Sequence, residues 1–457
     1  MKLLSSMASV SLVAMFALLV CGFGVESAKR PSMALIITAA PVYQPLAALR
    51  GGDRFPKGAE LMLVRDGAVT PLIEGFAATA DANISFDGKK LLFAGKERAI
   101  DKWSVWEFTL DDRSARKVIG GESDVIRPLY LPGDGLVFAR RTIHGFQLEA
   151  AKLDGSDTLS LTYMASSALP ETVLADGRIL FQAGFPLGTD LDHGAVPEMF
   201  LVYSDGSGVE SYRCDHGTAR WGGTQLASGD IVFTHGSHLA RFASPLATET
   251  SIAAPRAEYA GAVVETASNT WLLSARSSAG EHFALKRWKP GSQILESVLA
   301  RSGEDIVQPV ELAPRTRPNH HPTALHKWDY ANVLALDSRQ SRDGAMKAEP
   351  KLVRLQGLEA NGDITYLGSA PVESDGSFFV KVPGDEPVRF ALLDENGTEL
   401  RKEHGWFWMR KGEQRYCVGC HAGPEHAPDN RVPAVLLRTT TPADLTDLGQ
   451  SAVPGGR

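Results

Sequence analysis

The sequence lacks two features that would narrow its function: an excess of basic charge and extended helical periodicity. Its 47 Lys and Arg residues are outnumbered by 54 Asp and Glu, giving a net charge of −7. Because phosphate recognition needs a basic surface, this balance argues against nucleic acid as a partner. Apolar positions at helical spacing are rare, whereas glycine and short apolar runs are frequent. We therefore expect a mainly β fold, with two or three domains in 457 residues.

Long apolar runs are also scarce, and the one that stands out lies at the N-terminus. A positive start at Lys2 precedes an apolar run over 8–20, and the small residues Ser27 and Ala28 follow. This pattern is typical of a cleaved signal peptide over 1–28, since the run is short for a membrane anchor, which is the alternative. We expect a periplasmic or otherwise exported protein with no membrane span after cleavage.

Cysteine is scarce, with four in the chain, and Cys21 would leave with the signal peptide. The remaining three are an odd number, so they cannot all form intramolecular disulfides. Cys417, Cys420 and His421 read C-x-x-C-H, the haem c attachment signature, in which two thiols bind the porphyrin vinyl groups and the histidine binds the iron. A redox disulfide or a zinc site would need a βαβ setting or a second ligand pair. We predict one covalent haem c.

The second axial ligand of that haem is not evident from the sequence. Titratable or sulfur-bearing candidates lie close to the motif or upstream of it, namely His404, Met409, His426, His320, His321 and His326. The segment 404–409 is unusually aromatic, which suits both core packing and an apolar wall for a haem.

The chain between about 55 and 300 repeats a pair of short strands. Apolar runs recur at 91–93, 136–138, 179–181, 231–233 and 271–273, the first four after Gly-bearing turns. A second strand follows each of these runs, with an earlier copy at 60–64. A period of roughly 40–50 residues is in the propeller range. We predict a β-propeller over 35–310 with six blades, or alternatively seven, rather than a large β-sandwich.

The remainder of the chain predicts a small β-rich haem c domain over 311–457. Residues 300–350 read as a connector, and strands are expected at 351–355, 364–367, 377–382 and 388–393. Four prolines between 428 and 454 argue against a long helix after the motif. An all-helical cytochrome fold is therefore not expected.

The third remaining cysteine, Cys214, lies beside His216 after a predicted blade hairpin. An isolated cysteine is most often a buried free thiol. The alternative is a zinc site that combines Cys214 and His216 with a ligand from elsewhere.

The motifs together resemble the hydrazine synthase alpha subunit family. The resemblance extends over the propeller and is most specific in 319–322, 371–378, 412–413 and 417–421. It implies a six-bladed propeller followed by a middle domain with an unusual c-type haem, at which nitrogen species are condensed. In this family the motif histidine is thought to bind zinc together with a propeller cysteine, and a tyrosine four residues later ligates the iron.

Carried over by position, the resemblance assigns Cys417 and Cys420 to the haem thioethers and His421 to iron or zinc. Cys214 is then the candidate propeller cysteine for zinc. The tyrosine position holds Glu425, followed by His426, so these two become the candidate iron ligands. The family's third domain, with a second haem, is expected to be absent, and hydrazine synthesis by this chain alone does not follow.

Three functions remain open. The first is redox chemistry on a small nitrogen molecule at the haem, carried out with other subunits of a complex. The second is simple electron transfer to a redox partner protein, with both axial positions of the iron filled. The third is a propeller interaction module with a structural haem. The sequence does not decide whether the chain is an enzyme, and it identifies no catalytic residue.

Overall fold

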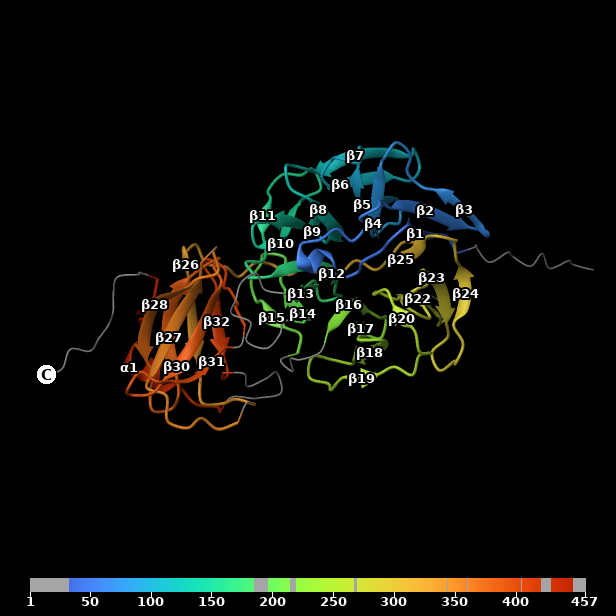
Figure 1. Ribbon diagram of the computed structural model, residues 1–457. Coiled ribbons are helices and arrows are strands. Elements are labelled where there is room, and N and C mark those ends of the chain that lie inside the picture. The colour runs from blue at the N-terminus through green and yellow to red at the C-terminus, as the bar shows by residue number, and fades with distance from the viewer. Residues whose placement is uncertain are drawn as a thin grey trace, which may run out of the picture. The chain divides into compact units, whose positions relative to one another are not determined.

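The computed structural model consists almost entirely of β-strands, which confirms the mainly β prediction (Figure 1). The structure describes residues 33–184, 196–213, 219–266, 269–342, 344–359, 361–403, 405–420 and 429–446. Their helical elements are the 3-10 turn η1 (Ala48–Arg50) and the short helix α1 (Ala434–Arg438).

The strands between Leu35 and Glu311 form six sheets, which are the blades of a β-propeller. The first three blades are β25 (Asp305–Glu311), β1 (Leu35–Ala40), β2 (Glu60–Arg65) and β3 (Ala68–Pro71); β4 (Ala78–Ile84), β5 (Lys90–Lys96), β6 (Ser104–Thr109) and β7 (Ser114–Ile119); and β8 (Val125–Leu131), β9 (Gly135–Thr142), β10 (Gly145–Lys152) and β11 (Leu159–Ser160). The other three are β12 (Ser167–Val173), β13 (Ile179–Gly184), β14 (Glu198–Val202) and β15 (Glu210–Ser211); β16 (Arg220–Gln225), β17 (Ile231–His235), β18 (His238–Phe242) and β19 (Thr250–Ser251); and β20 (Glu258–Tyr259), β21 (Val264–Glu265), β22 (Trp271–Arg276), β23 (Ala284–Trp288) and β24 (Glu296–Leu299). The described residues thus give six blades rather than seven.

The apolar runs of the sequence lie in the interior of the blades, where both faces of a strand are covered. In β5, Leu91, Leu92 and Phe93 are all fully buried. Leu91 and Phe93 belong to one hydrophobic cluster and Leu92 to another, because successive side chains point to opposite faces of a strand. Clusters shared by neighbouring blades recur around the ring, and this packing of blade against blade makes the propeller core.

The innermost strand of every blade is interrupted at an equivalent place. The pairing register shifts in β4, β8, β12, β16 and β25, and the sixth inner strand is split into β20 and β21. A β-bulge of this kind bends the strand and redirects one residue. The redirected positions form a ring around the central cavity, and they are Asp81, Arg127, Glu171, Gly222, Gly261 and Gln308.

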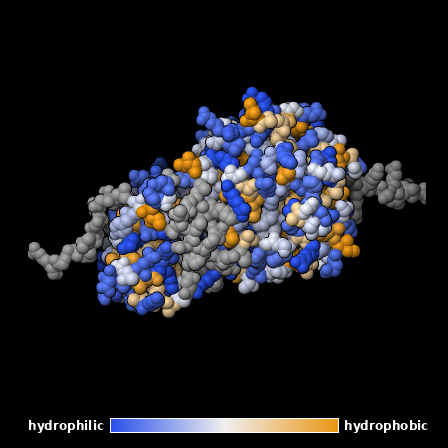
Figure 2. Space-filling model, viewed as in Figure 1, coloured by the Kyte–Doolittle hydropathy of each residue, from blue (hydrophilic) through white to orange (hydrophobic). Residues whose placement is uncertain are grey.

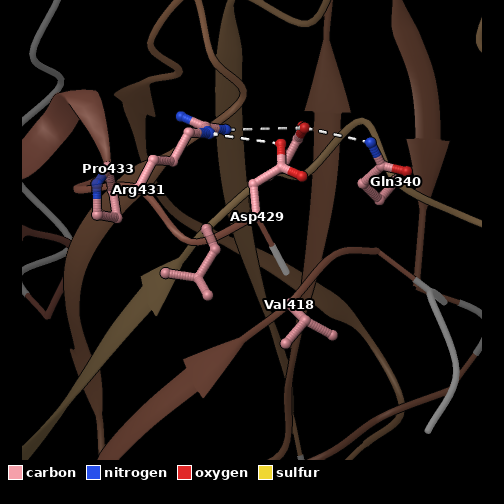
Figure 3. Close-up of a pocket in the computed structure, with 7 residues that line it drawn as sticks. Gln340, Val418, Asp429, Arg431 and Pro433 are labelled. Carbon is pink, nitrogen blue, oxygen red and sulfur yellow. Dashed lines mark hydrogen bonds and ion pairs between the residues drawn. The ribbon is translucent and has the colours of Figure 1, made fainter. Parts of the chain in front are cut away.

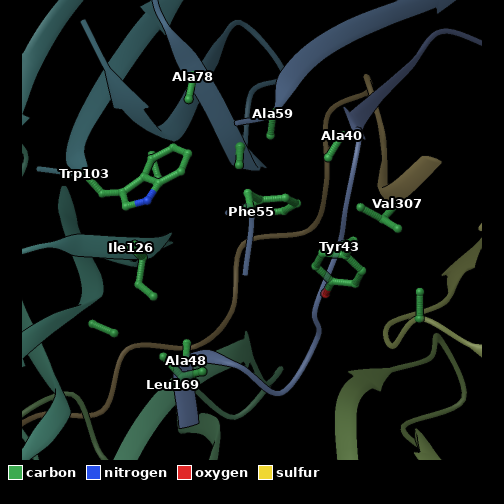
Figure 4. Packing of buried hydrophobic residues seen from close by; sticks show 14 of the residues in the cluster. Ala40, Tyr43, Ala48, Phe55, Ala59, Ala78, Trp103, Ile126, Leu169 and Val307 are labelled. Atoms are coloured by element: carbon green, nitrogen blue, oxygen red, sulfur yellow. The ribbon is translucent and has the colours of Figure 1, made fainter. Parts of the chain in front are cut away.

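The central cavity has a volume of about 920 Å³, and two chain segments outside the blades contribute to its lining. At one end, residues 41–59 cross the ring, and their Tyr43 and Phe55 pack with side chains from five blades (Figure 4). The rings of Tyr43 and Phe55 are 5.2 Å apart. At the other end, residues 313–319 line the cavity as the chain leaves β25. The cavity on the propeller axis is thus lined by the inner strands and by both of these segments.

A buried ion pair joins the 41–59 segment to this ring. Arg54 and Asp81 are both buried, and Arg54 Nη1 donates to Asp81 Oδ1 over 2.8 Å. Asp81 also accepts from the backbone N–H of Arg127 and from Gln308 Nε2. Burial raises the pKa of Asp81, but the charges of Arg54 and Arg127 and the bonds from Arg54 and Gln308 outweigh it and lower that pKa to about 2. The carboxylate is therefore ionised and fully engaged at neutral pH.

The ring of blades is closed by pairing the two ends of the propeller chain. β1 is antiparallel to β25, with Leu35 opposite Glu311 and Ala40 opposite Asp305. The predicted propeller range of 35–310 includes most of β25, whereas the connector expected over 300–350 was wrong for this stretch, because Asp305–Glu311 is a strand. The same stretch also contains β26 (Tyr330–Ala335), which begins the second domain.

The second domain is a sandwich of two four-stranded sheets. One sheet has the order β32 (Gln414–Cys417), β26, β29 (Phe378–Pro383) and β33 (Ala443–Asp444), and the other has the order β28 (Ile364–Pro371), β27 (Leu352–Leu358), β30 (Val388–Leu393) and β31 (Glu399–Lys402). A single cluster of buried side chains from both sheets, including Val333, Val380, Leu355 and Phe390, forms the core. The four strands expected here between 351 and 393 are confirmed within a few residues.

Residues 33–457 form one compact unit, and a few side chains tie the sandwich to the propeller. Trp408 is fully buried within a cluster of propeller residues, 6.4 Å from the ring of Tyr163. Arg410 Nη1 donates to the carbonyl oxygen of Ser160 over 2.6 Å and to the Tyr163 hydroxyl over 2.8 Å. The segment before the haem motif therefore serves as the docking contact.

On the visible face of the molecule, hydrophobic side chains are scattered among hydrophilic ones (Figure 2). Within the described ranges, no helix is long and apolar enough to cross a membrane.

Candidate functional site

The C-x-x-C motif begins where β32 ends. β32 lies parallel to β26, with Cys417 opposite Ala335, and the carbonyl oxygen of Cys417 accepts a hydrogen bond of 2.8 Å from the N–H of Leu336. β32 is the edge strand of its sheet. The motif thus leaves the domain at a sheet edge, where a large group can approach it.

The turn that starts β32 depends on Gly412. This residue has a φ of +82°, and a Cβ placed there would lie 1.9 Å from the carbonyl oxygen of His326. The next residue, Glu413, is buried and accepts hydrogen bonds from the N–H of Arg410 and the side chain of Arg415. The Gly412-Glu413 pair therefore fixes where the strand to Cys417 begins.

Neither Cys417 nor Cys420 is in a disulfide, and both are partly buried. They pack against the apolar core of the sandwich. Burial raises the pKa of the Cys417 thiol to about 11, although the charge of Arg415 opposes this. Cys417 is therefore protonated at neutral pH, unlike the thiolate of a redox-active or zinc-bound cysteine.

A small polar cavity lies beside Val418, the residue that follows Cys417 in the motif (Figure 3). Its volume is about 40 Å³, enough for a water molecule but far less than a porphyrin needs. It is lined by Leu336, Asp337, Gln340, Val418, Asp429, Arg431 and Pro433. The cavity is therefore part of the frame around the motif, and a haem would lie outside it.

Two carboxylates hold this frame together. Asp337 Oδ1 accepts from Arg339 Nε over 2.8 Å, and Asp375 pairs with Arg431. Asp375 Oδ2 also accepts from the N–H of Ala434 at the start of α1, over 2.8 Å. Burial raises the pKa of both carboxyls, but their hydrogen bonds outweigh it and lower both pKa values. Both groups are thus ionised and bound at neutral pH.

Gly376 leaves room for the Asp337 carboxylate to lie close to the backbone next to Asp375. Its φ is +81°, and a Cβ there would lie 2.2 Å from Asp337 Oδ1 and 3.0 Å from Arg339 Nε. The following residue, Ser377, is fully buried, and its Oγ accepts from the N–H of Val435. The 371–378 segment singled out in the sequence is therefore a structural support of the motif.

The upstream histidines are exposed and lie against different segments. The ring of His321 lies 4.0 Å from that of Tyr203 and is tilted by 30° to it, and His320 lies next to Gly133. His326 stacks on Trp328 at 4.4 Å, and its Nε2 lies 3.4 Å from the side-chain amide of Gln414. Of the three, only His326 therefore contacts the strand that leads to the motif.

The aromatic segment before the motif is used for packing. Trp408 inserts into the propeller, Phe407 lies 5.7 Å from the ring of Phe390, and Met409 is fully buried in the sandwich core. Met409 is thus a core residue rather than an accessible iron ligand. His421, Glu425, His426, Cys214, His216 and His404 lie outside the described residues.

One cluster of metal-ligating side chains was not anticipated from the sequence. His235, His238 and Glu249 of the β16–β19 blade place their ligand atoms within 4.8 Å of one another. The signal that could have revealed it is the pair of histidines on either side of a Gly-Ser turn.

Comparisons with known proteins agree with this description. Residues 337–422 match the family model of the hydrazine synthase alpha subunit middle domain. Among solved structures, the hydrazine synthase of Kuenenia stuttgartiensis superposes with a TM-score of 0.77 at 15% identity, over 89% of this chain and 72% of that one. The resemblance to the hydrazine synthase alpha subunit family is thereby confirmed, and so is the propeller followed by a β domain.

More distant likenesses concern parts of the chain. TolB from Acinetobacter baumannii matches with a TM-score of 0.43 at 13% identity, over 61% of this chain and 66% of that one. A chain of the nidogen/laminin complex matches with a TM-score of 0.43 at 9% identity, over 62% of this chain and all of that one. None of the curated protein sequences matches the chain.

Proposed function

We propose that this chain is an exported c-type haem protein that carries out redox chemistry on a small nitrogen molecule as one subunit of a larger complex. The observation that carries the proposal is the pair of cysteines, Cys417 and Cys420, at the edge of a domain that matches the hydrazine synthase alpha subunit middle domain. The family's designation as an alpha subunit supports other subunits as partners. The N-terminal segment supports export, since haem c is attached outside the cytoplasm.

The described residues fit a covalently held haem. Both thiols are partly accessible, and Cys417 stands at the end of an edge strand. The high pKa of the Cys417 thiol, set by its apolar surroundings, keeps it neutral. A haem bound there would supply an iron centre for electron transfer or for binding small nitrogen species.

The protein's own residues would hold and shield this group. Cys417 and Cys420 would anchor it, and the apolar side chains packed around them would exclude water from one side. The Asp337 and Asp375 ion pairs would keep β26 and the 371–378 segment in register beneath the motif. His421 would bind iron, or zinc together with Cys214, and Glu425 or His426 would be the further iron ligand.

The first test is the absorption spectrum of the full chain expressed with the cytochrome c maturation machinery. We expect covalent haem, shown by the mass of the intact protein and by a c-type reduced α band. Replacing Cys417 and Cys420 together by serine should abolish covalent haem, whereas the matched thiol variant Cys214→Ser should retain it. Covalent haem in the double variant, or none in the parent protein, would contradict the proposal.

Addition of carbon monoxide to the reduced protein separates the proposed chemistry from simple electron transfer. An iron with an open coordination position shifts its Soret band when CO binds. A low-spin spectrum indifferent to CO would instead indicate an electron carrier or a structural haem. Zinc analysis of Cys214→Ser and His421→Ala then tests the zinc pair.

A further inference from the structure

The cluster of His235, His238 and Glu249 is built by the architecture of its blade. β17 ends at His235 and β18 begins at His238, and the two-residue turn Gly236-Ser237 joins them. The register places His235 directly opposite His238. Residues paired in this way point to the same face of the sheet, so the hairpin brings the two imidazole rings together. Their centroids are 4.9 Å apart.

The third member comes from the next strand connection. Glu249 precedes β19, which pairs with β18 through Arg241 and Thr250. Its Oε1 contacts Nδ1 of His235, and its Oε2 accepts a hydrogen bond of 2.8 Å from Nε of Arg220. The side chains of His235 and Glu249 are 20% and 17% exposed, so the cluster is sheltered but reachable from solvent.

The donor set selects the kind of ligand. Two imidazole nitrogens and one carboxylate oxygen are three of the four ligands of a zinc site, whereas Ca²⁺ and Mg²⁺ prefer oxygen atoms alone. Ligand atoms around tetrahedral zinc lie about 3.3 Å apart, given bonds of about 2.0 Å. The present separations are within 4.8 Å, so small side-chain rotations suffice to close the site.

Arg220 has the geometry of an outer support. It is buried, its guanidinium lies 5.3 Å from the centre of the Phe242 ring, and it binds the carboxylate oxygen that does not face His235. Such a hydrogen bond orients a carboxylate for metal binding. It also explains why Glu249 keeps one oxygen directed at the histidines.

We propose that His235, His238 and Glu249 form a zinc-binding site in the β16–β19 blade. The three described ligands include no thiol, so they differ from those of both the C-x-x-C-H motif and the expected pairing of Cys214 with His421. Three protein ligands leave the fourth position of a tetrahedral zinc ion for a water molecule or a small exogenous ligand.

The test measures zinc in the full-length protein after equilibration with ZnCl₂ and removal of free metal. His238→Ala and Glu249→Gln should each lose one equivalent of zinc relative to the parent protein. The matched control is His282→Ala, because His282 also faces a carboxylate, Asp305, but belongs to no group of three metal-ligating side chains among the described residues. This control should keep the full zinc content.

A second readout keeps the proposal testable if one variant folds poorly. Zinc should raise the melting temperature of the parent and of His282→Ala in a concentration-dependent way, and MgCl₂ should not. Glu249→Gln, which preserves side-chain volume, should require at least 100-fold more zinc for the same rise. Equal zinc content and equal thermal response in Glu249→Gln and the parent would overturn the proposal. Because no haem ligand is altered, this result does not depend on haem attachment.

Discussion

Replacing Gly376 by alanine should weaken the frame of the haem motif by more than backbone strain alone. An L-residue at its φ of +81° costs roughly 1–2 kcal/mol. The new Cβ would also lie 2.2 Å from Asp337 Oδ1, so this carboxylate must move away from Arg339. A charged hydrogen bond contributes about 1.5–3 kcal/mol, which we reduce to about 1–2 because Arg339 is a third exposed.

The sum is about 2–4 kcal/mol for Gly376→Ala. Gly397 provides a matched control in the same domain, since its φ is +79° but a Cβ there would meet nothing within 4 Å. Gly397→Ala should therefore cost only the backbone strain of roughly 1–2 kcal/mol. Both variants carry the strain of a positive φ, and only Gly376→Ala also disturbs the contact with Asp337. The difference between them therefore measures that contact.

The assay is urea unfolding of both variants, combined with the fraction of protein that acquires covalent haem. Gly376→Ala should unfold at lower urea and carry less haem than Gly397→Ala. Because the pKa of Asp337 is lowered by its bonds, its stabilisation is present above its unfolded pKa and lost as the pH falls through the folded one. The difference in the free energy of unfolding between Gly376→Ala and Gly397→Ala should thus become smaller at acidic pH. Equal stability and equal haem content would refute the argument.

Two further predictions concern the propeller and its docking contact. Asp81→Asn leaves the buried Arg54 uncompensated and should cost about 3–5 kcal/mol in urea unfolding at pH 7, whereas Asp101→Asn should cost much less because its partner Arg98 is 74% exposed. Since the folded pKa of Asp81 is about 2, below its ordinary 3.8, the parent should lose this stabilisation between about pH 4 and pH 2, and Asp81→Asn should not. Trp408→Ala should cost about 3–5 kcal/mol through the cavity it leaves. Trp408→Phe should cost clearly less than Trp408→Ala, because it removes fewer buried atoms and because the buried indole N–H has no hydrogen-bond partner among the described residues; an equal loss in both variants would contradict this explanation.

The blades were predictable because each repeats a local pattern, a turn followed by a wholly apolar run such as 91–93. Such a run lies between two neighbouring blades, so burial on both faces appears directly in the sequence. The innermost strand of each blade, including the closing strand β25, has no such apolar run after a turn. β25 includes Gln308 and Pro309 at its bulge, and its partner β1 lies some 270 residues earlier. Pairing at that range depends on the whole ring rather than on local composition.

The residues of the candidate site also fall into those that could be predicted from the sequence and those that could not. The C-x-x-C-H spacing singled out Cys417 and Cys420 as the predicted haem c attachment site, and this assignment stays a prediction. The roles of Gly376 and Gly412 could not be predicted, because each is required by an approach to a distant residue, Asp337 or His326. Met409 could be read either as a ligand or as core until its burial was known. Zinc binding by Cys214 stays a prediction.

The seam between β1 and β25 also determines how the ring would respond to mechanical force. Leu35 and Glu311 face each other at one end of this ladder, and the N–H of Leu312 donates to the carbonyl oxygen of Ala34 just beyond them. If the chain were held before Leu35 and after Glu311, tension would load these bonds one after another from that end, as in peeling. A shear geometry would load all of them at once. The propeller should therefore open at its seam under a smaller load than is needed to extract any interior blade.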